Sequence, residues 1–240
     1  MRADVLAFRE FYQSPLGKSV DQIIGERLLQ MWEQDPATLQ HKMMVGLGYT
    51  LPYLSRAKEL GAETFAFMPA DQGVTHWPSF NNNRSILTSY HQLPLADSAV
   101  DYMLLVHALE HSSRPKHLLR EVWRVLAPGG HVIIVVPNRR RIWSTLENTP
   151  FGSGRPYSAT QLRLLMQEQM LPIDWWDTAL MLPPFSRLSV DKLLPVCERP
   201  IRFFGKNLGG ALIVCARKQV YGAIPDKKLK LRSQPLMIGG

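Results

Sequence analysis

The chain has 240 residues, of which 45% are hydrophobic and 20% are charged. This balance is typical of a soluble globular protein and excludes a largely disordered chain, and the length predicts one large α/β domain. No apolar run reaches the ~20 residues of a membrane-spanning helix, and no apolar block follows a basic start, so we expect no secretory signal and a cytoplasmic location.

The net charge of +8 is concentrated at the end of the chain, because residues 217–240 contribute +5 of it. A basic tail is more often a solvated solubility element than a binding arm. We therefore expect residues 219–240 to form a basic, flexible tail. Nucleic acid or an anionic surface stays open as its partner but is not favoured.

The first 36 residues are expected to form an N-terminal helical extension. A short helix is expected near Val5–Tyr12, and a longer one begins at Leu16. The longer segment repeats apolar residues at helical spacing, which predicts an amphipathic helix packed against the domain. These residues are Val20, Ile23, Ile24, Leu28 and Met31.

Residues 37–218 are expected to form the main domain. Between residues 42 and 136, apolar runs of strand length alternate with helical patterns, which predicts a mostly parallel sheet with helices on both faces. The expected strands are KMMVGL, TFAFM, SILTS, VDYMLLVH and HVIIVV. A helix after the fourth strand is expected to be capped by Ser112 or Ser113, with Pro115 in its first turn, and to be stopped by APGG.

The last third of the chain offers fewer signals. SATQ, at residues 158–161, has the form of a capping box and predicts a helix to about Met170. PIDWWDTAL is expected to be a strand, SRLSVDKLL a helix, and GGALIVCAR a final strand paired with HVIIVV. Cys197 and Cys215 have no paired spacing, so buried thiols are expected instead of a disulfide or a zinc site.

Two strings, LPLADSAVDYMLLVHALEH and LLREVWRVLAPGGHVIIVVPN, resemble the second half of class I S-adenosylmethionine-dependent methyltransferases of the small-molecule (type 11) kind. In that family an Asp opens the fourth strand, Leu-Glu-His follows its end, and a Pro-Gly-Gly turn introduces the fifth. The positions in register are Asp97, Asp101, Leu109, Glu110, His111, Leu126, Pro128, Gly129 and Gly130. The resemblance covers residues 40–140 and implies a Rossmann-like fold and S-adenosylmethionine as cofactor.

The first half departs from the family's Asp-x-Gly-x-Gly-x-Gly turn. With Gly48 matched to the first glycine, Gly46 replaces the acid, and Thr50 and Pro52 replace the later glycines. Met68 stands where the family has an acid that binds both ribose hydroxyls. A thioether cannot replace two charge-assisted hydrogen bonds of roughly 1.5–3 kcal/mol each, so other contacts must compensate.

The resemblance places the cofactor at the carboxyl ends of the strands. Its expected contacts are Gly46, Leu47, Gly48, Tyr49, Thr50, Met68, Gln92, Leu93 and His107. The alternative for the two glycines is a tight strand-to-helix turn with no ligand. Gly46-x-Gly48 as a nicotinamide site is a weaker hypothesis, because a third glycine and a following ribose acid are missing.

His107 and His111 are the candidate catalytic residues, because a neutral imidazole can accept a proton near pH 7. A histidine satisfied by the backbone is the alternative. HALEH also has the His-x-x-Glu-His spacing of some zinc peptidases, but His107 falls at a strand end, so no metal is expected.

Arg139, Arg155 and Tyr157 are the candidate substrate contacts. NRRRIW follows the fifth strand, where arginines can bind an anion by paired hydrogen bonds, and FGSGRPYS has the glycines of a mobile flap. A solvated arginine run and a simple turn are the alternatives.

The sequence therefore predicts methyl transfer from S-adenosylmethionine to an unidentified acceptor. The alternative is a catalytically inactive methyltransferase-like protein that serves as a binding or regulatory partner, which the altered turn and Met68 favour.

Overall fold

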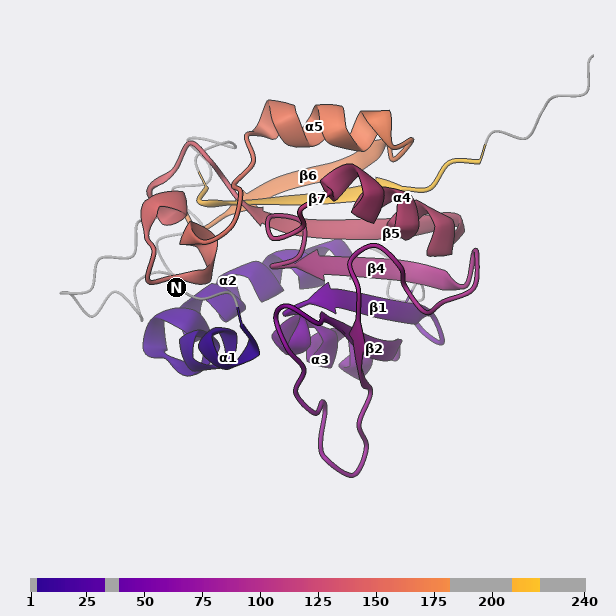
Figure 1. Cartoon of the computed structure of the whole chain (residues 1–240), viewed down its shortest axis with the longest axis horizontal. Coiled ribbons are helices and arrows are strands. Elements are labelled where there is room, and N and C mark those ends of the chain that lie inside the picture. Colours follow the sequence, from indigo (N-terminus) through magenta and orange to yellow (C-terminus); the bar gives the residue numbers. More distant parts are fainter. Residues whose placement is uncertain (1–3, 33–38, 182–208, 221–240) are drawn as a thin grey trace, which may run out of the picture.

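A computed structural model describes residues 4–32, 39–181 and 209–220. Its centre is a seven-stranded sheet with the order β3-β2-β1-β4-β5-β7-β6. Helices α1 (Val5–Gln13), α2 (Pro15–Trp32) and α3 (Leu51–Glu59) pack on one face of this sheet (Figure 1). Helices α4 (Pro115–Val125) and α5 (Ala159–Glu168) pack on the other face. The strands are β1 (Met43–Gly48), β2 (Glu63–Pro69), β3 (Ser85–Thr88), β4 (Val100–Val106), β5 (Leu126–Pro137), β6 (Ile173–Ala179) and β7 (Ala211–Arg217).

The sheet is mixed, with a parallel part and an antiparallel part. Strands β1 to β5 pair in parallel, while β7 runs antiparallel to both β5 and β6. The predicted pairing of GGALIVCAR with HVIIVV is confirmed, with Ile133 opposite Cys215. Strand β7 does not close the sheet, because β6 lies outside it. The Rossmann-like α/β architecture is confirmed.

Two apolar cores fill the space between the sheet and its helices. Alternate residues of β1 belong to different cores: Met44 packs with α1, α2 and α3, whereas Val45 and Leu47 pack with α4 and α5. Since both faces of the strand are covered, every residue of β1 is apolar or glycine.

The cap predicted for α5 is observed, and the cap predicted for α4 is not. The capping box before α5 is confirmed, because Ser158 and Gln161 each bond the other's backbone N–H. The predicted cap of α4 is wrong: Arg114 precedes the helix without a side-chain cap, and Ser112 Oγ accepts a hydrogen bond from the Arg114 N–H at 3.3 Å. APGG lies within β5, which begins directly after α4.

The N-terminal helices belong to the same core as the sheet. Arg56 of α3 makes a bidentate ion pair with Asp21 of α2, with nitrogen–oxygen distances of 2.6 and 3.0 Å.

Within the described ranges, no helix has the length and apolarity needed to cross a bilayer. SRLSVDKLL, Cys197 and residues 221–240 lie outside the described residues.

Candidate functional site

The turn after β1 brings this strand close to the end of β4. Gly48 has φ +87, and a Cβ on it would collide with the carbonyl oxygen of Val106. Only glycine combines that backbone conformation with so close an approach. Gly46 serves packing instead, because a Cβ there would collide with Thr50 and Leu54 at the start of α3.

Two backbone amides of this turn bond within the protein. The Tyr49 N–H donates to the Val106 carbonyl at 2.9 Å, and the Thr50 N–H donates to the Gly48 carbonyl at 3.2 Å. In this arrangement neither amide is free to bind the polar part of a ligand. The Thr50 side chain is fully buried as well.

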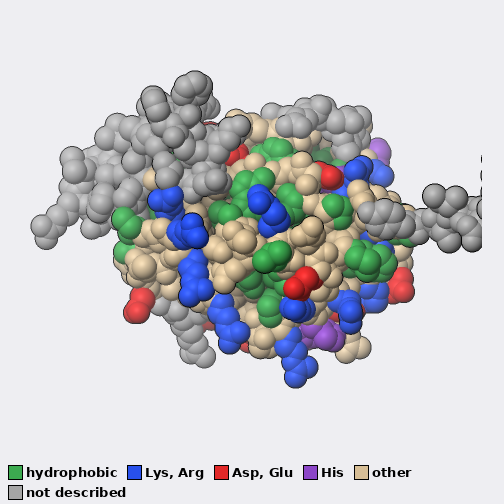
Figure 2. All heavy atoms as spheres, turned by 90° about the horizontal axis from the view of Figure 1, so that it is seen from above, with side chains coloured by type: hydrophobic (Ala, Val, Ile, Leu, Met, Phe, Trp, Pro, Cys, Tyr) green, Lys and Arg blue, Asp and Glu red, His purple; other side chains and the backbone are tan. Residues whose placement is uncertain are grey.

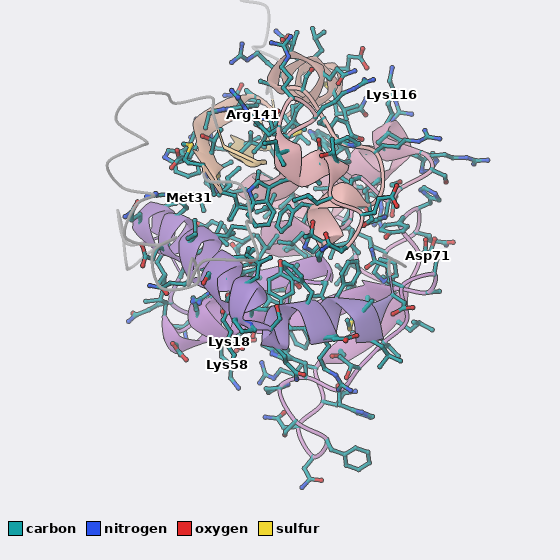
Figure 3. All side chains as sticks on the ribbon, turned by 90° about the vertical axis from the view of Figure 1, so that its left-hand side faces the viewer. Lys18, Met31, Lys58, Asp71, Lys116 and Arg141 are labelled. Carbon is teal, nitrogen blue, oxygen red and sulfur yellow. The ribbon has the colours of Figure 1, made fainter. Side chains whose placement is uncertain are left out.

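Aromatic side chains of α1 cover the ends of β1 and β4. The Phe8 ring stacks on His107 at 5.1 Å between centroids, and the Tyr12 ring stacks on Tyr49 at 5.4 Å. Figure 3 looks onto this edge of the sheet and shows α1 and α2 crossing it. The space above Tyr49 and His107 is therefore filled by the protein's own first helix.

A buried chain of hydrogen bonds lies beneath α1. Tyr53 Oη is 3.2 Å from Tyr12 Oη, which is 3.0 Å from His107 Nε2, and His107 Nδ1 is 3.2 Å from Glu110 Oε1. Burial raises the pKa of Tyr12 and of Tyr53 well above the ordinary phenol value, so both phenols are uncharged. Glu110 Oε2 is buried and has no hydrogen-bond partner among the described residues. His107 is thus oriented by a carboxylate on one side and covered by a phenol on the other.

The loop after β2 fixes the start of α1 to the same place. The Val5 N–H donates to the Gln72 carbonyl at 2.7 Å, and Gln72 Nε2 donates to the His107 carbonyl at 2.5 Å. Gln72 therefore joins the first helix to the end of β4.

The other expected cofactor contacts are divided between the two cores. Met68 packs in the core of α1 to α3, whereas Leu47 and Leu93 lie in the core of α4 and α5. The Leu93 N–H donates to Glu121 at 3.2 Å, and Gln92 is exposed. The structure thus brings Gly48, Tyr49 and His107 together, while Gln92 faces solvent.

His111 lies beside the Phe8 ring, at 6.1 Å between centroids. Burial lowers its pKa below the ordinary histidine value, so the imidazole is neutral near pH 7. Its Nε2 is buried, and no residue in the described part of the chain forms a hydrogen bond with it. Across the described part of the chain, no three His, Cys, Asp or Glu side chains are grouped as metal ligands.

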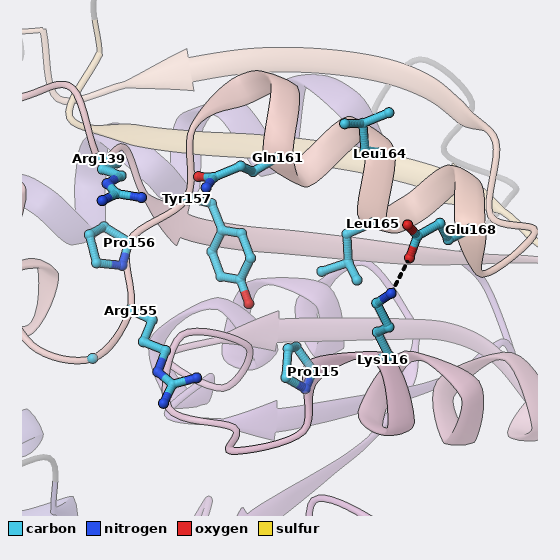
Figure 4. A pocket seen from close by; sticks show the side chains of 11 residues that line it. Pro115, Lys116, Arg139, Arg155, Pro156, Tyr157, Gln161, Leu164, Leu165 and Glu168 are labelled. Carbon is cyan, nitrogen blue, oxygen red and sulfur yellow. Dashed lines mark ion pairs between the residues drawn. The ribbon is translucent and has the colours of Figure 1, made fainter.

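The expected substrate contacts line one groove. Arg139, Arg155 and Tyr157 face it from the end of β5 and from the loop before α5 (Figure 4). The Tyr157 N–H donates to the Pro137 carbonyl at 3.0 Å, which fixes this loop beside β5.

Comparison with known proteins identifies the domain that carries these features. A family model described as a methyltransferase domain (Methyltransf_11) matches residues 43–134. This segment is a class I S-adenosylmethionine-dependent methyltransferase domain.

Relatives of the methyltransferase domain are distant. A malonyl-[acyl-carrier protein] O-methyltransferase of Marinomonas sp. (strain MWYL1) is 25% identical over 140 residues, which are 52% of this chain and 50% of the relative. The chain thus matches about half the length of that relative. In Thermotoga maritima, a methyltransferase described as a possible histamine N-methyltransferase is 18% identical, with a TM-score of 0.59, over 90% of this chain and 96% of its own. A methyltransferase of Aquifex aeolicus is 14% identical, with a TM-score of 0.54, over 82% and 91%.

The cofactor of this methyltransferase family does not fit the closed site. The Phe8 and Tyr12 rings occupy the place above Tyr49 and His107, and Met68 offers no carboxylate for a ribose. The obstructing rings belong to α1, whereas the missing carboxylate is a feature of β2. With α1 in this position, the place above Tyr49 and His107 is taken by side chains of the protein itself.

Several residues of this candidate site are not foreseen from the sequence. Phe8, Tyr12, Gln72 and Glu110 contact His107, and Tyr53 contacts Tyr12. The aromatic spacing in FREFY, at residues 8–12, is a signal that α1 buries a ring-rich face. Nothing in that spacing indicates which strand end the face covers.

Proposed function

We propose that this protein transfers a methyl group from S-adenosylmethionine to an unidentified acceptor. The observation that carries the proposal is the family match over residues 43–134, the segment that contains β1, β4 and the turn at Gly48. The name of the Marinomonas relative makes a carboxylate oxygen one candidate acceptor group.

His107 is the preferred general base in this proposal. Its Nδ1 contacts Glu110 at 3.2 Å, and its Nε2 contacts Tyr12 at 3.0 Å, so departure of α1 would free Nε2 to accept a proton. His111 is the second candidate, since its lowered pKa keeps the imidazole in the form that accepts protons. We further propose that Arg139, Arg155 and Tyr157 contact the acceptor.

Calorimetric titration of the full chain with S-adenosylhomocysteine tests the proposal. The methyltransferase hypothesis predicts saturable heat that weakens when Tyr49 is replaced by alanine. A titration without heat at millimolar ligand, both in the wild type and in the variant carrying Phe8→Ala and Tyr12→Ala, removes the hypothesis.

The second candidate function is that of an inactive methyltransferase-like protein that acts as a binding or regulatory partner. It is favoured by Phe8 and Tyr12 stacking on His107 and Tyr49, and by Met68 at the end of β2. For this candidate the same titration stays flat, and it stays flat when the α1 rings are removed.

Domain limits and location complete the proposal. Residues 1–36 are assigned to the helical extension, 37–218 to the methyltransferase domain and 219–240 to a basic tail, in a cytoplasmic protein. Limited proteolysis followed by mass spectrometry tests the limits, because a flexible tail is cut first.

A further inference from the structure

A groove of about 650 Å³ runs between the start of α4 and α5 (Figure 4). We propose that it binds a small amphipathic anion, with a carboxylate beside Arg139 and Arg155 and an apolar chain along Leu164. The inference that this anion is the methyl acceptor rests on the proposed function. The inference that the groove binds such an anion does not depend on that function.

The size of the groove suits a small molecule, because ligand sites commonly enclose about 300–1,000 Å³. Eleven residues line it: Pro115, Lys116, Arg139, Gly154, Arg155, Pro156, Tyr157, Gln161, Leu164, Leu165 and Glu168. Figure 2 views the molecule from the side of α5 and shows hydrophobic side chains interspersed with basic ones on this face.

The backbone holds the two arginines at one end of the groove. The Arg139 N–H donates to the Tyr157 carbonyl at 2.9 Å, and the Arg155 N–H donates to the Glu110 carbonyl at 2.8 Å. Because these bonds fix the positions of the Cα atoms, the two exposed guanidinium groups extend from a rigid rim.

Positive charge is in excess at the end of the groove that carries Arg139 and Arg155. Within the described residues, neither Arg139 nor Arg155 pairs with a carboxylate, whereas Lys116 Nζ lies 2.7 Å from Glu168 Oε2 at the other end. Burial raises the pKa of Tyr157 to about 12, so its phenol adds no negative charge. A guanidinium binds carboxylates well because its N–H groups match their two oxygens.

An apolar wall continues from the charged end. Leu164 is 55% exposed, and it lines the groove together with Leu165, Pro115 and Pro156. An exposed leucine inside a concave surface favours an apolar ligand group, because water is released when that group binds.

The inner rim of the groove adjoins the proposed base. Tyr157 Oη lies 3.5 Å from the Leu109 carbonyl, and a Cβ on Gly154 would lie 3.0 Å from Cε1 of His111. Only Ala108 separates residues 109–111 from His107, so an anion held in the groove lies next to the segment that carries both candidate bases.

The test is titration calorimetry of the full chain with sodium octanoate, sodium acetate and octyltrimethylammonium chloride. We expect octanoate to bind saturably and the other two probes to bind at least about tenfold more weakly, since each lacks one half of the recognised chemistry. Arg139→Gln with Arg155→Gln is expected to weaken octanoate binding about tenfold, and Leu164→Ser about threefold. Arg120→Gln, an exposed arginine of α4 outside the groove, is the matched control and is expected to change it less than twofold.

Equal binding of octanoate by the double arginine variant and the wild type would overturn the proposal. So would binding of acetate or of the alkylammonium as tight as that of octanoate, or no octanoate heat at millimolar concentration. No cofactor is present in these titrations. Failure here therefore leaves methyl transfer to another acceptor class intact, and failure to bind S-adenosylhomocysteine leaves the groove proposal intact.

Discussion

The phenol oxygen of Tyr12 lies 3.0 Å from Nε2 of His107, although 95 residues separate them in the chain. This contact joins α1 to the end of β4, where His107 has φ +52. Positive φ is unusual for a residue other than glycine and often accompanies functional sites. The first helix therefore covers the strand end where the candidate cofactor site lies.

Loss of the Tyr12 hydroxyl should destabilise the protein modestly. Tyr12→Phe keeps the ring stacked on Tyr49 but removes the hydrogen bonds to His107 and Tyr53. We expect the free energy of unfolding to fall by about 1–2 kcal/mol, because a buried imidazole nitrogen loses its partner. Urea denaturation measures the change. Tyr157→Phe is the control, since its single long contact of 3.5 Å predicts a smaller loss.

The role of Gly48 in the turn after β1 can be tested with Gly129 of β5 as a matched control. Both have positive φ, at +87 and +76, but a Cβ on Gly48 would collide with Val106 whereas one on Gly129 would meet nothing within 4 Å. Gly129→Ala should cost about 1–2 kcal/mol for its backbone conformation alone. Gly48→Ala should cost about 2 kcal/mol more, because β1 and β4 must also separate. Thermal unfolding that ranks the two variants equally would contradict the role assigned to Gly48.

His111 should make stability depend on pH. Because burial lowers its pKa in the folded protein, the unfolded chain binds a proton first as the pH falls through about 6.5. The free energy of unfolding is therefore expected to decrease as the pH falls from about 7.5 towards 5.5. In His111→Asn this dependence should be shallower, as measured by urea denaturation at several pH values. A variant with the wild-type slope would refute the assignment, and the exposed His76→Asn serves as control.

Arg124 holds the loop after β3 in place. Its guanidinium donates to the carbonyls of Leu93 and Leu95 and to the carboxylates of Glu121 and Asp97. Arg124→Gln should destabilise the protein by about 1–2 kcal/mol and accelerate amide hydrogen exchange around Leu93. Unchanged exchange there would mean that the loop is held by its apolar contacts alone.

The sheet and its helices are largely predictable from local sequence. The apolar run MMVGLG and the alternation of strands with helices to Pro137 predict parallel pairing, because each strand must be covered on both faces. The capping box at Ser158 is equally local, since both partners lie within four residues. The predicted cap at Ser112 shows where local sequence is not sufficient. The Ser112 hydroxyl accepts a hydrogen bond from the Arg114 N–H, before the helix begins.

The closure of the site is not predictable in this way. Periodicity indicates that Phe8 and Tyr12 share a buried face, but the contact with His107 depends on the path of α1 across the edge of the sheet. That path is set by non-local contacts, such as the bonds of Gln72 to Val5 and to His107. The arginines of the groove are visible in NRRRIW and FGSGRPYS, yet their approach depends on the pairing of Tyr157 with the end of β5.

Calorimetry on two forms of the chain tests whether α1 blocks the candidate cofactor site. S-adenosylhomocysteine is titrated calorimetrically into the wild-type chain and into the variant carrying Phe8→Ala and Tyr12→Ala, after circular dichroism has shown that both are folded. We expect the variant to bind at least about tenfold more tightly, because α1 no longer has to be displaced. Tighter binding by the wild type would contradict the account, since α1 would then hold the cofactor in place instead of excluding it.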